Sequence, residues 1–263
     1  MTSSLVRRRT IWFPTLLGWL IIGGLVCGPL VSWWFYGERF LAITDRRAAD
    51  VLVVEGWIGA TGINAAFTEY RSGGYRIVVT TGGLTGERWS RRRWNYAVEA
   101  EEQLLHLGVA RDRLILAPSR DAEIQRTFEM AAAARRALQA NGLHPAAINI
   151  FTRGSHARRS RLIFEKVFGA ETQVGIISWK PPHFDEEPWW QSSERAEDLV
   201  KETVGYFFER LLNSGRRSNQ LDADERPSSA ALENDSAPAL PPRARRLVLA
   251  RNRYDFLQAD QRT

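Results

Sequence analysis

Five short runs of apolar residues alternate with longer segments of helical periodicity, and this alternation constrains the fold more than any other feature of the chain. Each run is nearly free of charge, as is typical of strands that are buried on both faces of a sheet. Strands that alternate with helices are joined by right-handed crossovers, which make the sheet parallel and cover both of its faces. The sequence therefore predicts a Rossmann-like, three-layer αβα domain with a mainly parallel sheet over residues 50–212.

The boundaries of these elements follow from charge, glycine and helical spacing. The predicted strands are Asp50–Glu55, Tyr75–Thr80, Arg113–Ala117, Ala147–Phe151 and Gln173–Trp179. The predicted helices are Thr61–Ser72, Arg92–Leu107, Ala122–Ala140, Ala157–Phe168 and Arg195–Leu212, three of which end at glycine-containing stop signals. The last helix carries apolar residues on one face, namely Val200, Val204, Phe207, Phe208 and Leu211.

The N-terminal part contains an uncharged run from Thr10 to Gly37. About 20 apolar residues cross a bilayer as a helix, so this run predicts one transmembrane anchor within residues 1–37. Aromatic residues at both ends resemble the belts found at membrane interfaces. Arg7, Arg8 and Arg9 favour a cytoplasmic N-terminus, which places the domain outside the cytoplasm. A buried core helix is the alternative interpretation.

Composition limits the class of protein further. The net charge of +6 arises from 36 basic and 30 acidic residues that are dispersed along the chain, so we do not predict a nucleic-acid partner. Cys27 is the only cysteine, which excludes an intrachain disulfide and a cysteine-based metal site. The histidines have no metal-ligand spacing, and no metal site is predicted.

Three segments lie outside the regular pattern. Residues 38–49 are predicted to be a polar connector between the anchor and the domain. Residues 213–263 are polar and lack apolar periodicity, so they are predicted to be largely disordered. Trp189 and Trp190 follow a proline-rich loop, which either lines a pocket for a sugar or prenyl chain or packs over the edge of the sheet.

The clearest candidate site is the stretch Ile148–Arg161, in which a strand ends in a turn and a helix begins. A helix N-terminus at the carboxyl edge of a parallel sheet favours an anion. Ser155, His156, Arg158 and Arg159 lie in this turn and the first turn of the helix. Arginine suits phosphate or carboxylate recognition, and histidine transfers protons near neutral pH. The alternative is a solvated basic face of the helix.

Other strand ends should meet at the same edge. They contribute Glu55 and Gly56, then Thr81, Gly82 and Gly83, and, near the start of a later helix, Arg126 and Thr127. Neither a dinucleotide fingerprint nor a phosphate-binding loop with its lysine is present, so the cofactor stays unknown. A buried carboxylate at Glu55 requires a partner, and it either orients His156 or an arginine or caps the turn.

Several motifs in this order resemble the YdcF-like family of SanA- and ElyC-type envelope proteins, in particular a membrane-anchored branch with Glu-Gly-Trp after the first strand. These motifs are DVLVVEGW, VVTTGG, LGV, RTFEMA and GSHARRSRL, and they extend from about Asp50 to Leu212. The resemblance implies a Rossmann-like fold, an N-terminal anchor and a role in envelope polysaccharide or lipid-carrier metabolism.

The resemblance also assigns site residues. The His-x-x-Arg motif of the family corresponds to His156 and Arg159, its glycine pair to Gly82 and Gly83, and its acidic helix position to Glu99. Its threonine corresponds to Thr127. Two positions depart from the family pattern, because Met130 stands where many members have asparagine and Glu55 replaces a glycine of the first loop.

Together these observations predict a bacterial plasma-membrane protein whose domain faces the extracytoplasmic side and acts in envelope or exopolysaccharide biogenesis. We expect it to bind a phosphorylated lipid-carrier or nucleotide-like ligand; if it is an enzyme, it is a phosphate-ester hydrolase or transferase. The alternative is a non-catalytic accessory protein that contacts envelope-assembly proteins. The candidate catalytic residues are His156 and Glu55; the candidate ligand-binding residues are Gly56, Thr81, Gly82, Gly83, Glu99, Arg126, Thr127, Ser155, Arg158 and Arg159.

Overall fold

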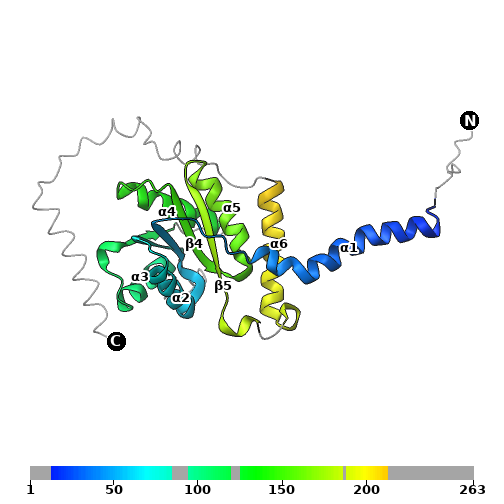
Figure 1. Ribbon diagram of the computed structural model, residues 1–263, viewed down its shortest axis with the longest axis horizontal. Helices are drawn as coiled ribbons and strands as arrows, with labels where there is room; N and C mark the ends of the chain where they lie inside the picture. The colour runs from blue at the N-terminus through cyan, green and yellow to red at the C-terminus, as the bar shows by residue number, and fades with distance from the viewer. Residues whose placement is uncertain (1–12, 85–93, 120–124, 186–187, 213–263) are drawn as a thin grey trace, which may run out of the picture. The chain divides into compact units, whose positions relative to one another are not determined.

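A computed structural model describes residues 13–84, 94–119, 125–185 and 188–212 (Figure 1). The arginine triplet at residues 7–9 and the predicted disordered tail at 213–263 lie outside the described residues. All of the predicted strands and helices of the domain fall, wholly or in large part, within them.

The described strands form one parallel sheet in the order β3-β2-β1-β4-β5. They are β1 (Val51–Glu55), β2 (Ile77–Gly82), β3 (Leu114–Pro118), β4 (Ala147–Arg153) and β5 (Gln173–Trp179). Helices cover both faces, so the predicted α/β fold class is confirmed. Strand β4 continues two residues beyond its predicted end, which brings Thr152 and Arg153 to the carboxyl edge of the sheet.

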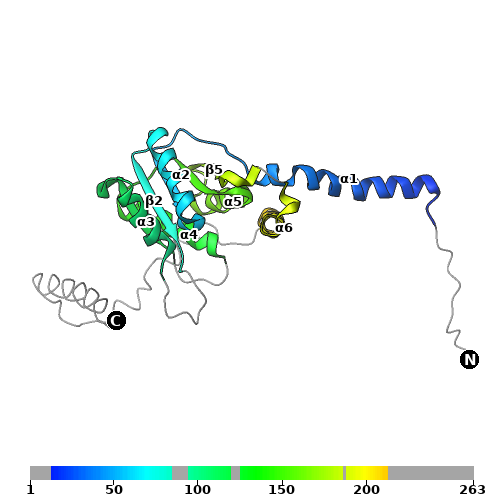
Figure 2. The same ribbon diagram turned by 90° about the horizontal axis from the view of Figure 1, so that it is seen from below.

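Helices α2 (Gly59–Ser72) and α3 (Tyr96–His106) cover one face, and α4 (Arg126–Ala140) and α5 (Ala157–Phe168) cover the other (Figure 2). Successive side chains of a strand point to opposite faces. Accordingly, Val51 and Val53 pack with α4 and α5, whereas Leu52 and Val54 pack with α2 and α3. The unbroken apolar runs are thus explained by two separate core layers.

Short 3₁₀ turns join several of these elements at functionally relevant places. They are η1 (Gly56–Ile58), η2 (Arg111–Arg113), η3 (Gly154–His156), η4 (Pro182–Asp185) and η5 (Trp189–Gln191). The turns η1 and η3 follow β1 and β4 directly. The chain runs from β1 outward through β2 to β3, and then from β4 outward to β5, so the strand order reverses between β1 and β4. Ligands of open α/β sheets bind at such a reversal.

The segment predicted as a polar connector is tied firmly to the sheet. Its first residues belong to helix α1, which ends at Leu41, and Asp45 forms an antiparallel bridge with Ile176 of the edge strand. The buried side chain of Asn149 accepts a hydrogen bond from the backbone N–H of Arg47 and donates one to its carbonyl oxygen, both at 2.8 Å. Asn149 also donates to the hydroxyl of Tyr75, whose pKa is raised to about 12, chiefly by burial.

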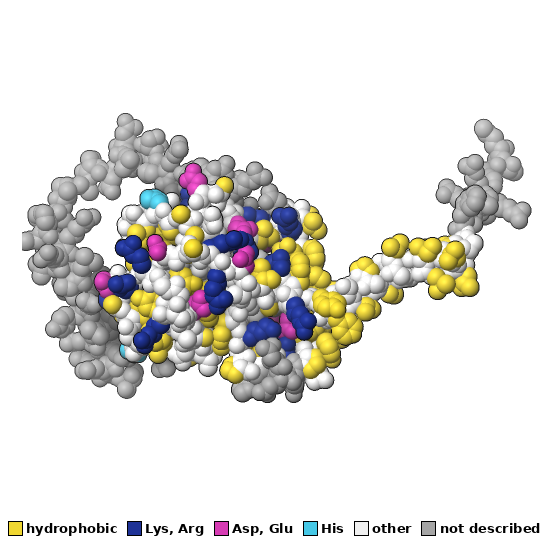
Figure 3. Space-filling model, in the orientation of Figure 1, with side chains coloured by type: hydrophobic (Ala, Val, Ile, Leu, Met, Phe, Trp, Pro, Cys, Tyr) yellow, Lys and Arg dark blue, Asp and Glu magenta, His cyan; other side chains and the backbone are white. Residues whose placement is uncertain are grey.

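Helix α1 (Leu16–Leu41) has 26 residues, about 39 Å at the usual rise of 1.5 Å per residue. Within the described part of the chain it is the one helix long and apolar enough to cross a membrane. Its large apolar side chains up to Tyr36 are mostly exposed, and Figure 3 shows hydrophobic side chains along it. The length and composition of α1 therefore support the prediction of one membrane-spanning helix.

The last part of α1 contacts helix α6 (Ser193–Leu211) and the turn η5. Glu38 accepts two hydrogen bonds from Arg195, and the ring centroids of Trp34 and Trp189 lie 4.6 Å apart. The indole N–H of Trp189 donates to the carbonyl oxygen of Trp34 at 3.0 Å. Of the two interpretations of the tryptophan loop, packing is the better one, although the rings pack on α1 and not on the edge of the sheet.

Candidate functional site

A cavity of about 340 Å³ lies at the carboxyl edge of the sheet, beside the reversal of strand order. The loops after β1, β2, β3 and β4 form its walls, together with the N-terminus of α4 and one face of α6. Its basic side chains are Arg126, Arg153, Arg159 and Lys201, and its acidic ones are Asp198 and Glu202. His156 and Trp57 complete this charged lining. The cavity is thus built mainly from the segments at which the sequence predicts an anion site.

Glu55 is the most deeply buried ionisable group near the cavity, with no exposed surface. One of its carboxylate oxygens, Oε1, accepts a hydrogen bond from the hydroxyl of Ser160 at 2.5 Å. The other, Oε2, accepts from the hydroxyl of Thr152 at 2.5 Å and from the indole N–H of Trp57 at 3.1 Å. These three donors replace water around the carboxylate, which explains how this side chain can be buried at the end of β1.

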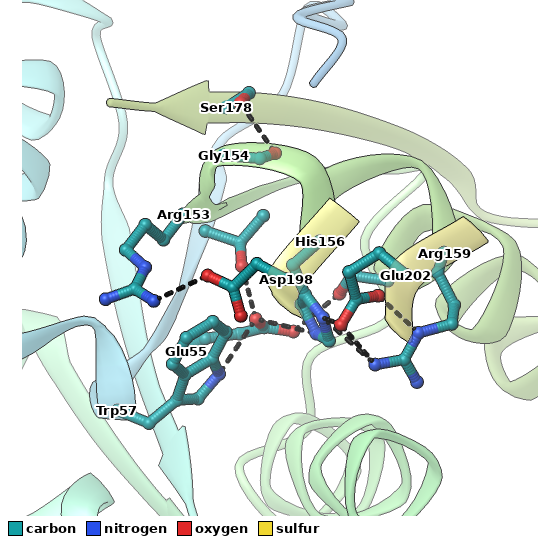
Figure 4. A network of polar contacts seen from close by, with 11 residues as sticks. Glu55, Trp57, Arg153, Gly154, His156, Arg159, Ser178, Asp198 and Glu202 are labelled. Atoms are coloured by element: carbon teal, nitrogen blue, oxygen red, sulfur yellow. Dashed lines mark hydrogen bonds and ion pairs between the residues drawn. The ribbon is translucent and has the colours of Figure 1, made fainter. Parts of the chain in front are cut away.

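His156 lies between two carboxylates (Figure 4). Its Nδ1 is 3.0 Å from Oε1 of Glu202, and its Nε2 is 3.5 Å from Oε2 of Glu55. The Nε2 atom is buried, and within the described part of the chain it makes no hydrogen bond of good geometry. The ring also meets the indole of Trp57 edge to face, with centroids 5.0 Å apart. His156 therefore connects the buried Glu55 to the wall of the cavity.

Arg159 and Glu202 form a two-pronged ion pair beside His156. Arg159 donates from Nε to one oxygen of Glu202 at 2.6 Å and from Nη2 to the other at 2.9 Å. Burial opposes ionisation of Glu202, but attraction to His156 and hydrogen bonds from His156 and Arg159 outweigh it and hold the pKa of Glu202 well below its usual range. Burial likewise lowers the pKa of Arg159, but the hydrogen bond and charge of Glu202 outweigh it and the net pKa is raised.

A second pair closes another side of the cavity. Arg153, the last residue of β4, donates from Nη2 to Asp198 of α6 at 2.9 Å. Its guanidinium also lies 5.7 Å from the ring centroid of Trp57. Both side chains of the pair are about one third exposed, at 36% and 31%, so solvent screens this pair more than the buried one.

Arg126 and Lys201 differ from the other two cations. Both line the cavity, both are exposed, and neither has an acidic partner among the described residues. Arg126 is the first residue of α4, and the side chain of the N-cap residue, Gln125, makes no capping hydrogen bond. Gln125 before it has a left-handed backbone with φ of 57°, unusual for a residue with a Cβ. The N-terminus of α4 and two cations that lack an acidic partner within the described ranges make the cavity attractive to an anion.

The structure brings six predicted site residues to the cavity: Gly83, Arg126, Thr127, Ser155, His156 and Arg159. Four others support it from behind. Glu55 does not line the cavity but contacts His156, and Thr81 donates its hydroxyl to the carbonyl of Met130. A Cβ at Gly56 or Gly82 would lie within 2.6 Å of Tyr96, so these glycines allow the strand ends to approach α3 closely.

Two predicted ligand-binding residues lie elsewhere. Glu99 is exposed in the first turn of α3 and does not line the cavity. Arg158 donates to the carbonyl oxygen of Phe40 and lies 3.9 Å from the centroid of its ring, so it holds the end of α1. Arg161 points to the same side as Arg158 and pairs with Asp45 and Glu165. Residues three apart share one face of a helix, which is why Arg159 alone of the three reaches the cavity.

Asp198, Lys201 and Glu202 were not predicted from the sequence as site residues. They lie on the side of α6 that lines the cavity, where Asp198 and Glu202 point away from the apolar stripe and Lys201 lies between them and Phe208. Their i, i+3 and i, i+4 spacing was a usable signal, because it places three charged side chains on one side of the predicted last helix. Nothing in the sequence pairs that side with the histidine loop, however. Within the described ranges, no group of three or more His, Cys, Asp or Glu side chains is placed to hold a metal ion.

The sequence matches no model of a known protein family, and no characterised protein matches it closely. The resemblance to the YdcF-like family thus stays a prediction from short motifs.

Proposed function

We propose that the protein is anchored by α1 in a bacterial plasma membrane and that its domain binds a phosphorylated ligand in the cavity on the extracytoplasmic side. The observation that carries the proposal is that Arg126, at the N-terminus of α4, and Lys201 of α6 both line the cavity and have no acidic partner in the described part of the chain. Phosphate oxygens accept hydrogen bonds from such cations and from free helix N–H groups.

Binding is favoured over catalysis by the surroundings of His156. Both ring nitrogens face carboxylates, and Nε2 is out of contact with solvent. Proton transfer to a molecule in the cavity would require the ring to leave one of these partners. Hence we propose that His156 and Glu55 position the loop after β4, and that the ligand charge is met by Arg126 and Lys201. The motif resemblance suggests that this phosphorylated ligand is an envelope lipid carrier or a nucleotide-like molecule.

Replacing Arg126 or Lys201 with glutamine is expected to weaken the binding of inorganic pyrophosphate by about 10- to 100-fold each. A hydrogen bond to a charged group contributes about 1.5–3 kcal/mol, and each 1.4 kcal/mol corresponds to a factor of ten. Isothermal titration calorimetry on the full-length protein in detergent measures the affinity, and thermal melts show whether the variants are folded. Both side chains are exposed, so the melting temperature should change little.

Arg113→Gln is the matched control, because this arginine is exposed but lies before β3, at the opposite edge of the sheet. It should bind pyrophosphate like the unaltered protein. Equal affinities for all three variants, or a protein that binds no pyrophosphate at all, would contradict the proposal.

The proposed orientation predicts a specific pattern of reporter activity. An alkaline phosphatase fused after Leu212 should be active, and a green fluorescent protein fused at the same position should be dark when exported by the general secretory route. The physical basis is the arginine cluster before the apolar helix, which favours retention of the N-terminus in the cytoplasm. The opposite pattern, a dark phosphatase and a bright fluorescent protein, would place the domain in the cytoplasm.

A further inference from the structure

Helix α6 has two faces of opposite character. Toward the domain it buries Arg195, Leu199 and Glu202. Away from the domain it exposes a stripe of apolar side chains at i, i+4, i+7, i+8 and i+11, which we call the α6 stripe: Val200 (61% exposed), Val204 (65%), Phe207 (40%), Phe208 (48%) and Leu211 (74%). An apolar stripe of this length on a water-exposed helix marks an interaction surface. The sequence predicts this stripe, and within the described part of the chain its side chains remain partly or largely exposed.

The stripe lies beside the aromatic end of α1. Trp33 donates its indole N–H to the hydroxyl of Thr203 at 3.1 Å, and its ring centroid is 5.5 Å from that of Phe207. The next residues, Trp34 and Phe35, contact Trp190 of η5, with ring centroids 5.7 and 6.2 Å apart. Helix α1, which can cross a membrane, therefore meets α6 and the turn η5 through one aromatic turn, formed by Trp33, Trp34 and Phe35.

The position of this turn along α1 sets its depth in a bilayer. About 20 residues cross the hydrocarbon core, so a crossing that begins at Leu16 ends close to Phe35. Tryptophan and tyrosine concentrate at this level of a membrane protein, where the hydrocarbon meets the head groups. Because Trp33 touches both Thr203 and Phe207, the adjoining part of α6 lies at the same level.

We propose that the α6 stripe is inserted into the interface of the bilayer that α1 crosses. The inference rests on the membrane anchorage in the proposed function, but not on the identity of the ligand. Helices that lie in a membrane interface bury an apolar face about 5–10 Å below the head groups and keep a charged face toward water. In α6 the charged face is the one that supplies Asp198, Lys201 and Glu202 to the cavity. The cavity is then held one helix width from the membrane surface.

The depth of single labelled positions tests the proposal. The full-length protein is reconstituted in vesicles of phosphatidylcholine and phosphatidylglycerol, and the only cysteine, Cys27 in α1, is labelled with the fluorophore NBD. In a Cys27→Ser background, Val204→Cys or Leu211→Cys is labelled instead. Glu102→Cys, an exposed position of α3, is the control for a water-facing label. Quenching is measured with nitroxide lipids labelled near the head group or deep in the chain, and with aqueous iodide.

Labels at 204 and 211 should be quenched strongly by the shallow nitroxide, shifted to the blue and protected from iodide. The label at 102 should be quenched by iodide alone, and the label at 27 by the deep nitroxide. Quenching at 27 without quenching at 204 and 211 would overturn the inference while leaving the anchor intact. Protection of 204 and 211 from both quenchers would mean that a second protein surface covers the stripe, which also overturns it. A label at 27 that no lipid quenches would refute the anchor itself.

Discussion

Replacing Glu55 with glutamine is expected to lower the free energy of unfolding by about 3–5 kcal/mol, the usual cost of breaking a buried charge network from one side. The carboxylate accepts hydrogen bonds from Thr152, Ser160 and Trp57 and faces His156. A glutamine amide keeps one accepting oxygen, but its NH₂ group would face donor hydrogens that need an acceptor. Leaving a buried donor unsatisfied costs about 1–3 kcal/mol on its own.

Urea denaturation followed by tryptophan fluorescence measures the change, with Glu102→Gln as the control. Glu102 is exposed on the surface of α3, where such substitutions are usually tolerated. Glu102→Gln should change the free energy of unfolding by no more than about 0.5 kcal/mol. For a domain of this size the loss at Glu55 corresponds to a fall in melting temperature on the order of 10 °C. A Glu55→Gln protein that unfolds at the same urea concentration as the unaltered one would show that the carboxylate network does not stabilise the fold.

Acid is expected to destabilise the protein through Glu202, and Glu202→Gln should remove much of this sensitivity. The folded-state pKa of Glu202 is lowered, so the carboxylate contributes stability above its unfolded-state pKa of about 4.3. That contribution is lost as the pH falls below about 4.3 toward the lower, folded-state pKa. At neutral pH the variant should already be less stable by about 3–5 kcal/mol, because Arg159 and His156 lose their shared carboxylate.

The measurement is the free energy of unfolding from urea titrations at pH values between 7 and 3. The curve of the unaltered protein should fall more steeply below about pH 4.5 than that of Glu202→Gln, so that the two converge in acid. Glu69, beside Arg46, also has a lowered pKa, held down chiefly by the hydrogen bond from Arg46, and it contributes equally to both curves. Parallel curves across the whole range would mean that Glu202 is not the carboxylate responsible.

Most of the fold could be predicted because its signals are local. Val51–Glu55 forms a buried strand and Ala157–Phe168 a helix as expected, since hydrophobic periodicity and turn residues are read within one short window. Alternation of the two element types then restricts the topology to a parallel sheet with covered faces. The loops after β1, β2 and β4 could also be placed together, because the carboxyl ends of parallel strands share one edge.

Part of the candidate site could also be predicted from the sequence. His156, Arg159 and Glu55 come together because each stands at or just after the end of a strand next to the strand-order reversal. Helical spacing places Arg158 and Arg161 on one face of α5 and Arg159 on another, but it does not say which face meets the cavity. That depends on which face of α5 packs on the sheet and which meets α6.

What the sequence alone determined is thus the set of elements, their order, the parallel sheet, the long apolar N-terminal helix and the apolar stripe of the last helix. Only the tertiary structure decided that α6 turns Asp198, Lys201 and Glu202 toward the cavity and that Trp33 and Trp34 hold the end of α1 against α6 and the turn η5. The physical reason is that periodicity reports which face of an element is apolar, whereas the partner of a charged or aromatic side chain is chosen among many similar groups by the packing of the whole chain.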